Sequence, residues 1–181
     1  MVRFFEKQEQ FQSFYTKLKF MLCPHCRLIG CLILHGYLYG YSDLGNSRIL
    51  RGRRIYCSNR HRKTGCGKTF SVLTAQVLPK FTVSASSLWR FLNNIKNGLN
   101  PARAFKMTGC PMAPTTIYRL LKKFVVNQVR IRSFLSRIKD PPAAGHTQSP
   151  AIQTILHLHG AFCDAACPIT AFQCRFQIPF F

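Results

Sequence analysis

Four cysteines near the start of the chain constrain its fold more than any other feature. Cys23 and Cys26 form a CxxC pair, and Cys57 and Cys66 follow farther along. A CxxC turn points both sulfurs toward the same cation, and a tetrahedral metal site needs four thiolate or imidazole ligands. The spacing therefore predicts that these four cysteines converge on one metal ion, which folds the segment around it.

The second pair departs from a simple knuckle, because eight residues separate Cys57 from Cys66. This leaves His61 as an alternative ligand and His25 as a weaker one. Gly67 follows Cys66, where a knuckle usually needs a positive φ. Four thiolates leave no position for water, so we expect one structural Zn²⁺ and no catalysis by the metal. The alternative is four buried cysteines without a metal.

Short β-prone runs surround these cysteines at residues 32–34, 37–39, 54–56 and 69–73. They predict a small N-terminal zinc ribbon of short antiparallel strands over residues 21–78, preceded by a lead helix over residues 1–20. Four tyrosines lie in or beside the strands. These are Tyr37, Tyr39, Tyr41 and Tyr56. We expect most of them to belong to the core, and base stacking is the alternative.

Residues 83–139 carry the signals of an all-α helix-turn-helix region. A first helix is predicted over residues 84–97 and ends before Gly98. Asn100 caps a short second helix that has Pro101 at its first position, and Pro114 begins a long third helix. On the third helix, apolar residues share one face, whereas Arg119, Lys123, Arg130 and Arg137 share the opposite one. An ordinary amphipathic bundle helix is the alternative.

Two prolines and a glycine predict a linker over residues 140–149, followed by a short, apolar, helical C-terminal tail over residues 150–181. The whole chain is therefore expected to be α+β. Cys163, Cys167 and Cys174 match no metal-binding spacing, and packing or a dimer contact is the preferred interpretation of them.

The charge of the chain indicates a polyanionic partner. The net charge is +21, with 26 Lys plus Arg against 5 Asp plus Glu. No acidic residue occurs between Leu44 and Lys139, a stretch that holds 20 of the basic residues. Nucleic acid is the commonest partner of such a chain, an anionic membrane is second, and a basic solvated surface without a partner is the alternative.

We expect double-stranded DNA as the partner, bound by cations of the ribbon and by the first turns of the third helix. The side chains at the start of that helix are those best placed to reach base edges. The predicted contacts are Arg48, Arg51, Arg53, Arg54, Arg60, Arg62, Lys63, Thr115, Thr116, Tyr118, Arg119, Lys122, Lys123 and Arg130.

Other classes of function are disfavoured by the sequence. The longest apolar run is too short to span a membrane, and the N-terminus lacks the core of a signal peptide, so a cytoplasmic, nucleoid-associated protein is expected. Nine cysteines in a reducing compartment favour metal ligands or free thiols over disulfides. Gly67-Lys68-Thr69 resembles the end of a phosphate-binding loop, but Arg62 stands where that loop needs glycine.

Two parts of the sequence resemble a known family. Residues 100–105 (NPARAF) and 113–121 (APTTIYRLL) resemble the helix-turn-helix of transposases and site-specific recombinases. The CPHC pair, Cys57 and the later CGKTFS are similar to the zinc ribbon that precedes such helices in insertion-sequence transposases. Together the two resemblances cover about residues 21–135.

The resemblance implies recognition of mobile-element DNA, because the catalytic half of that family has no counterpart here. Those enzymes hold two metal ions with three carboxylates, whereas only Asp140 and Asp164 follow the helical region. We therefore expect a non-enzymatic protein, with a second copy or a separate catalytic subunit as a further partner. The alternatives are a remnant or subunit of an active transposase, a complete nuclease, and an RNA- or ribosome-associated zinc-ribbon protein.

Overall fold

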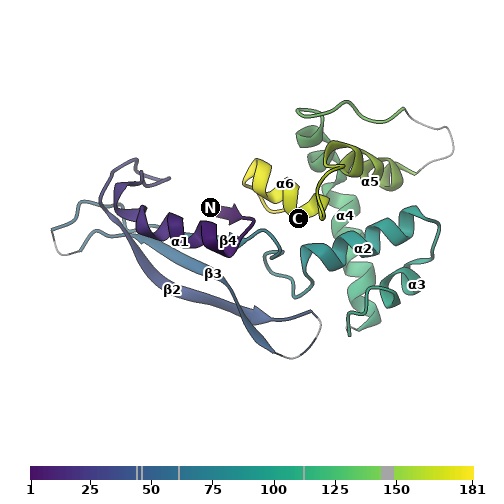
Figure 1. Cartoon of the computed structure of the whole chain (residues 1–181), viewed down its shortest axis with the longest axis horizontal. Helices are drawn as coiled ribbons and strands as arrows, with labels where there is room; N and C mark the ends of the chain where they lie inside the picture. The colour runs from purple at the N-terminus through teal and green to yellow at the C-terminus, as the bar shows by residue number, and fades with distance from the viewer. Residues whose placement is uncertain (44, 46, 61, 112, 144–148) are drawn as a thin grey trace.

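A four-stranded mixed sheet occupies one end of the molecule and helices occupy the other (Figure 1). The computed structural model describes residues 1–43, 45, 47–60, 62–111, 113–143 and 149–181. The strands are β1 (Val2–Phe5), β2 (Leu32–Tyr41), β3 (Arg48–Cys57) and β4 (Thr69–Thr74), in the order β1-β4-β3-β2. β1 pairs parallel with β4, and the other pairs are antiparallel.

This sheet shows that the predicted fold was wrong in its architecture, although the chain does combine helices and strands. Part of the expected lead helix is instead strand β1, which joins β4 to make a mixed sheet in place of a small antiparallel ribbon. The pairing joins distant segments, so a local pattern could not reveal it. β2 and β3 are also longer than expected, because β2 continues through Gly36.

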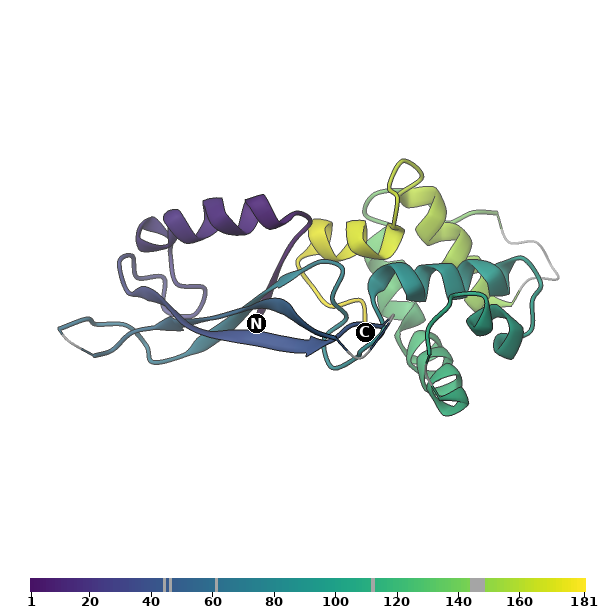
Figure 2. The same ribbon diagram turned by 60° about the horizontal axis from the view of Figure 1, so that its bottom comes forward.

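Helix α1 (Gln8–Thr16) packs on one face of the sheet, and the short 3₁₀ helix η1 (Leu18–Phe20) follows it (Figure 2). Phe11 and Phe14 contact Phe5 at ring-centroid distances of 5.3 and 5.1 Å. Beneath these rings lie Ile55 and Val72, which are fully buried. We call the sheet, α1 and η1 together the sheet part.

Three further helices have the order expected from the sequence. They are α2 (Ala85–Lys96), α3 (Pro101–Lys106) and α4 (Pro114–Leu135). The predicted cap is confirmed at Asn100, whose Oδ1 accepts from Arg103 N at 2.9 Å. Ser84, expected as the first residue of its helix, is instead the residue that caps α2, and its Oγ accepts from Ser87 N at 3.1 Å.

The C-terminal segment was expected as a short helical tail, and it contains two helices, α5 (Pro150–Ala161) and α6 (Pro168–Phe176). α5 packs on α2 and α4, and together these helices with α3 form what we call the helical part. α6 lies between the two parts and contacts both α2 and β1 (Figure 1). Residues 144–148 of the predicted linker lie outside the described residues.

Two glutamines near the C-terminus bind the sheet part. The buried Gln173 donates to the carbonyls of Ala75 and Val77 at 2.7 and 3.0 Å. Gln177 Oε1 accepts from the backbone N–H of Phe4 at 2.9 Å, and its Nε2 donates to the Phe4 carbonyl at 3.0 Å. The amide of Gln177 thus pairs with the backbone of Phe4 as a residue of a neighbouring strand would.

The tip of the β2–β3 hairpin docks on the helical part through Asp43. Its Oδ2 accepts from Ser84 N at 2.9 Å and from the Cys110 thiol at 3.9 Å. Burial alone would raise the pKa of Asp43, but hydrogen bonds from Ser84 and Ser87 outweigh it, so the pKa is lowered. The carboxylate therefore joins the hairpin to the start of α2 and to the loop before α4.

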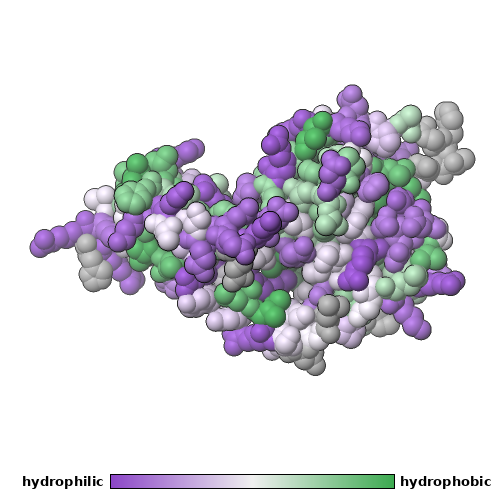
Figure 3. All heavy atoms as spheres, in the orientation of Figure 1, coloured by the Kyte–Doolittle hydropathy of each residue, from purple (hydrophilic) through white to green (hydrophobic). Residues whose placement is uncertain are grey.

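Hydrophilic side chains cover much of both parts on the face shown in Figure 3. Among the described residues, no helix has the length and apolar composition needed to cross a membrane.

Candidate metal centre and basic surface

The first pair of cysteines forms a compact knuckle after η1. Cys23 N donates to Leu28 O, and Arg27 N donates to Cys23 O, both at 2.9 Å. Arg27 has a φ of 63°, which closes the turn. His25 N points at Cys23 Sγ across 3.4 Å. Amides directed at a sulfur stabilise it as a thiolate, the form that binds a metal.

The second pair repeats this geometry in spite of its longer spacing. Cys57 N donates to Lys68 O, and Gly67 N donates to Cys57 O, again both at 2.9 Å. Gly67 has a φ of 70°, matching Arg27 in the first knuckle. Cys66 N points at Cys57 Sγ across 3.3 Å. The two knuckles therefore have equivalent backbone hydrogen bonds around their cysteines. The extra residues of the second knuckle form a loop that projects from it.

Gly65 closes that loop, although no spacing or motif in the sequence marks it. Its N–H donates to Ser58 O at 2.9 Å. A Cβ at Gly65 would lie 2.3 Å from Ser58 O and 2.7 Å from Cys57 Sγ. Real Cβ atoms do not approach other atoms so closely, so only glycine fits beside this sulfur without movement of the loop.

The four sulfurs converge on one point. Those of Cys23, Cys26, Cys57 and Cys66 all lie within 4.8 Å of one another. Cys23 Sγ is 3.9 Å from Cys66 Sγ, and Cys26 Sγ is 3.7 Å from Cys57 Sγ. Four sulfurs at the usual zinc–sulfur bond length around a tetrahedral ion would lie roughly 3.8 Å apart. The cluster can hold a metal ion with four protein ligands and no open position.

Without a cation, the cysteines of this cluster differ in acidity. A backbone hydrogen bond from Leu28 is the main cause that lowers the pKa of Cys26 to about 7. Burial raises the pKa of Cys57. A bound divalent cation would ionise all four thiols together, because coordination deprotonates a thiol outright.

Other candidate ligands lie apart from this cluster or cannot be placed. Cys31, just before β2, directs its sulfur to the Ile29 carbonyl at 3.6 Å. His25 is exposed, and His61 lies outside the described residues. Among the described residues, Cys163, Cys167 and Cys174 join no group that could hold a metal.

The predicted DNA contacts fall on two surfaces. In the sheet part, Arg48, Arg54, Arg60 and Arg62 are exposed and Lys63 is partly so. At the start of α4, the exposed side chains are those of Thr115, Tyr118, Arg119, Lys122 and Lys123, with Thr116 half-buried. The buried face of the same helix carries Leu120, Phe124 and Ile131. The N-terminal half of α4 therefore presents hydroxyl, aromatic and cationic groups to the solvent.

Two of the predicted contacts are occupied by hydrogen bonds within the protein, and a third is half-buried against aromatic rings. Arg51 donates to Phe81 O at 2.6 Å, and Arg130 donates to Pro179 O and Phe180 O at 3.0 and 2.8 Å. Burial lowers the pKa of both guanidinium groups. Arg53 packs on aromatic rings and is half-buried. Arg51 and Arg130 are therefore not free to reach a ligand as the protein stands.

The tyrosines of β2 are another correction to the expected site. Tyr37, Tyr39 and Tyr41 are 55%, 50% and 60% exposed, so they do not belong to the core. Tyr56, on β3, is half-buried and packs on His35 at 5.4 Å between ring centroids. Their exposure depends on which part of the sheet α1 covers, and no local pattern in the sequence shows this.

Comparison of this chain with models of protein families, with curated proteins and with solved structures gives no significant match.

Proposed function

We propose that this chain is a zinc-dependent, DNA-binding protein related to transposases, which recognises mobile-element DNA without cleaving it. The observation that carries the proposal is the exposed basic face at the start of α4. That face follows α2 and α3 in the order of a helix-turn-helix, within a stretch of 96 residues, 44–139, without a carboxylate.

The chemistry of this face suits the major groove of a duplex. Arg119 can contact guanine through two hydrogen bonds, and Thr115 and Tyr118 can reach neighbouring bases or phosphates. Lys122 and Lys123, one turn farther on, suit the phosphate backbone. The loop of the second knuckle adds the exposed cations Arg60 and Arg62 on the sheet part, where they can neutralise further phosphates.

Zinc is the metal that best suits the cysteine cluster. Four thiolates at tetrahedral spacing are typical of structural zinc, which has no redox chemistry and needs no open position. The metal would fix the two knuckles and with them the arginine-bearing loop. We do not propose strand cleavage, because no carboxylate among the described residues joins a group that could hold a metal ion.

The experiment is a set of duplex-binding titrations followed by fluorescence anisotropy. If about six phosphates are contacted, the association constant should fall by roughly five log units per tenfold rise in salt. Arg119→Ala should relax the preference for a selected site over random duplex, whereas Arg175→Ala, which removes an exposed charge from α6, should not. A flat salt response would contradict DNA binding, and a structured RNA that outcompetes every duplex would contradict a DNA target.

A further inference from the structure

The β2–β3 hairpin extends beyond the part of the sheet that α1 covers, and aromatic rings line this extension. Tyr37 and Tyr39 are half-exposed, with ring centroids 6.0 Å apart and planes inclined by 31°. Large aromatic side chains seldom stay exposed side by side without a partner, because their burial is favourable.

Arginines alternate with these rings. The guanidinium carbon of Arg53 is 4.0 Å from the centroid of Tyr37 and 5.2 Å from that of Tyr15 on α1. The guanidinium carbon of Arg48 is 4.5 Å from the centroid of Tyr39. Tyr15, Arg53, Tyr37, Tyr39 and Arg48 thus form one continuous row of stacked groups, which we call the tyrosine-arginine ladder.

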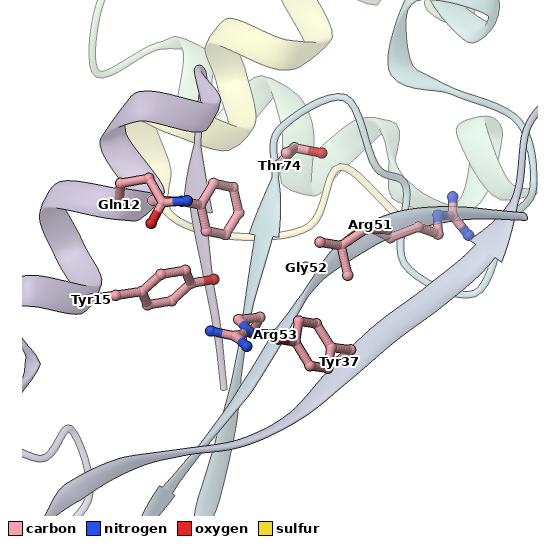
Figure 4. A pocket seen from close by; sticks show the side chains of 9 residues that line it. Gln12, Tyr15, Tyr37, Arg51, Gly52, Arg53 and Thr74 are labelled. Carbon is pink, nitrogen blue, oxygen red and sulfur yellow. The ribbon is translucent and has the colours of Figure 1, made fainter.

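A pocket of about 170 Å³ lies at the α1 end of the ladder. Figure 4 shows the Tyr15 hydroxyl directed toward Arg53 and Tyr37 on the other side of that guanidinium, whereas the guanidinium of Arg51 points away. Gln12 and Thr74 also line the pocket and offer hydrogen-bonding groups. The pocket therefore combines aromatic walls, a cation and polar groups in one place.

The other end of the ladder leads toward α4. Tyr41, the last residue of β2, is 60% exposed and follows Tyr39 along the strand. It lines a second hollow of about 300 Å³, to which Thr116 of α4 also contributes. The nearest acid in the sequence, Asp43, is buried, and its carboxylate accepts hydrogen bonds from Ser84 N and from the Cys110 thiol.

We propose that the tyrosine-arginine ladder binds an unpaired nucleic-acid strand by stacking its bases on the tyrosines. Alternating rings and cations suit a single strand, because unpaired bases expose their faces and each base has a phosphate beside it. A duplex hides those faces and can use only the arginines. The pocket beside Tyr15 takes one base at the end of the strand.

This inference rests on the proposed function, because it places the strand as the continuation of a duplex held at α4. The strand leaves the duplex near Thr116, crosses Tyr41 and runs along the hairpin to the pocket. A duplex with an unpaired tail should therefore bind more tightly than the same duplex with blunt ends.

The test uses four fluorescent probes with the full chain: a blunt duplex, the same duplex with an oligo(dT) tail, and free oligo(dT) and oligo(U). Anisotropy should show that the tail raises affinity about tenfold, since stacking of each base on an aromatic side chain contributes about that factor or more. The variant Tyr37→Ala/Tyr39→Ala should lose this gain and bind the blunt duplex unchanged. Tyr37→Phe/Tyr39→Phe should keep the gain, because its rings remain.

The control is Phe20→Ala, which removes an aromatic side chain 78% exposed and outside the ladder. It should keep the gain from the tail, and thermal melting should show that all variants fold. A 2-aminopurine in the tail should be quenched by the wild type and by the phenylalanine variant, but not by the alanine variant.

The outcomes separate this inference from the proposed function. Failure of the blunt duplex to bind, while free oligo(dT) binds through the tyrosines, overturns the proposed function and supports the ladder. Equal binding of blunt and tailed duplex, or equal competition by polyglutamate against oligo(dT), overturns the ladder. A stronger dependence on the tyrosines with oligo(U) supports the ladder and identifies its strand as RNA.

Discussion

The sheet part and the helical part of this protein are stabilised by different means. In the sheet part, two of the four clustered cysteines, Cys23 and Cys57, are fully buried members of the hydrophobic core. In the helical part, the core consists of leucines and aromatic rings such as Leu88, Phe91 and Phe124. We therefore expect folding of the sheet part to depend on a bound metal ion, whereas folding of the helical part depends on apolar burial.

The size of each core explains the difference. A small sheet with one covering helix buries little apolar surface, and small modules usually need a metal or a disulfide in addition. α5 packs on both α2 and α4, α6 packs on α2 and α5, and the buried side chains of these helices belong to one larger core. A change that affects one part should therefore leave the other part folded.

Removal of the metal should have the largest effect. Structural zinc contributes about 10–16 kcal/mol of folding free energy in small zinc-finger peptides. A chelator, or the variant Cys66→Ser, should therefore abolish hydrogen-exchange protection in β2, β3 and β4 and leave α2 and α4 protected. Native mass spectrometry should show one zinc per chain in the wild type and in the control Cys163→Ser, which changes an exposed cysteine. Equal loss of protection in both parts would contradict the comparison.

A core substitution in the helical part should give the opposite pattern. Phe124 is fully buried and stacks on Phe180 with ring centroids 6.3 Å apart. Phe124→Ala should lower the free energy of unfolding by about 3–5 kcal/mol through the lost burial and the cavity. The zinc content should stay at the wild-type value. Val126→Ala, at a position 70% exposed on the same helix, should change stability little in the same denaturation assay. Loss of zinc from the Phe124 variant would show that the two parts do not fold separately.

A methyl group added at Gly65 should weaken metal binding by the second knuckle. Gly65→Ala would bring its Cβ to 2.7 Å from Cys57 Sγ and force the loop to move. We expect a cost of about 1–3 kcal/mol, as for overpacked cores, which corresponds to roughly a 5- to 150-fold weaker zinc affinity. Gly36→Ala is the matched control, since its Cβ would meet no atom within 4 Å. Competition with a chromogenic chelator measures both, and equal affinities would disprove the steric argument.

Removal of the Asp43 contact between the two parts should have the smallest effect on stability. Asp43→Ala removes the acceptor of Ser84 N, and loss of such a cap costs about 1 kcal/mol. Asp43→Asn keeps an acceptor and should lose less. Because the pKa of Asp43 is lowered in the folded state, its contribution is present at neutral pH and is lost as the pH falls through the folded-state pKa, below the unfolded value of about 3.9. Thermal melting at pH 7 should rank wild type above Asp43→Asn and Asp43→Asn above Asp43→Ala.

Local patterns revealed the features that depend on short spacings. The CxxC pair and the later cysteines predicted the cluster, and Ser84, Asn100 and Pro101 predicted the starts of α2 and α3. In each of these cases the residues that interact lie close together in the chain or are of a rare type. Such local signals can be recognised without knowledge of the tertiary structure.

Contacts between distant segments were not predicted, because the residues that form them are far apart in the chain. The pairing of β1 with β4 joins the start of the chain to residues 71–74, and no local pattern specifies it. Arg51 and Arg130 were expected on a DNA-binding surface because the sequence shows their charge and not their neighbours. Tyr37 and Tyr39 are half-exposed, which likewise depends on packing between distant segments.

The amide bonds of Gln177 to Phe4 have a consequence for the order in which this protein is made. During synthesis, residues 2–5 leave the ribosome long before residue 177, and until then the outer edge of the first strand has no amide to pair with. An open strand edge invites pairing with other chains. We therefore expect the nascent sheet to be more open to pairing with other chains until α6 and Gln177 have been made.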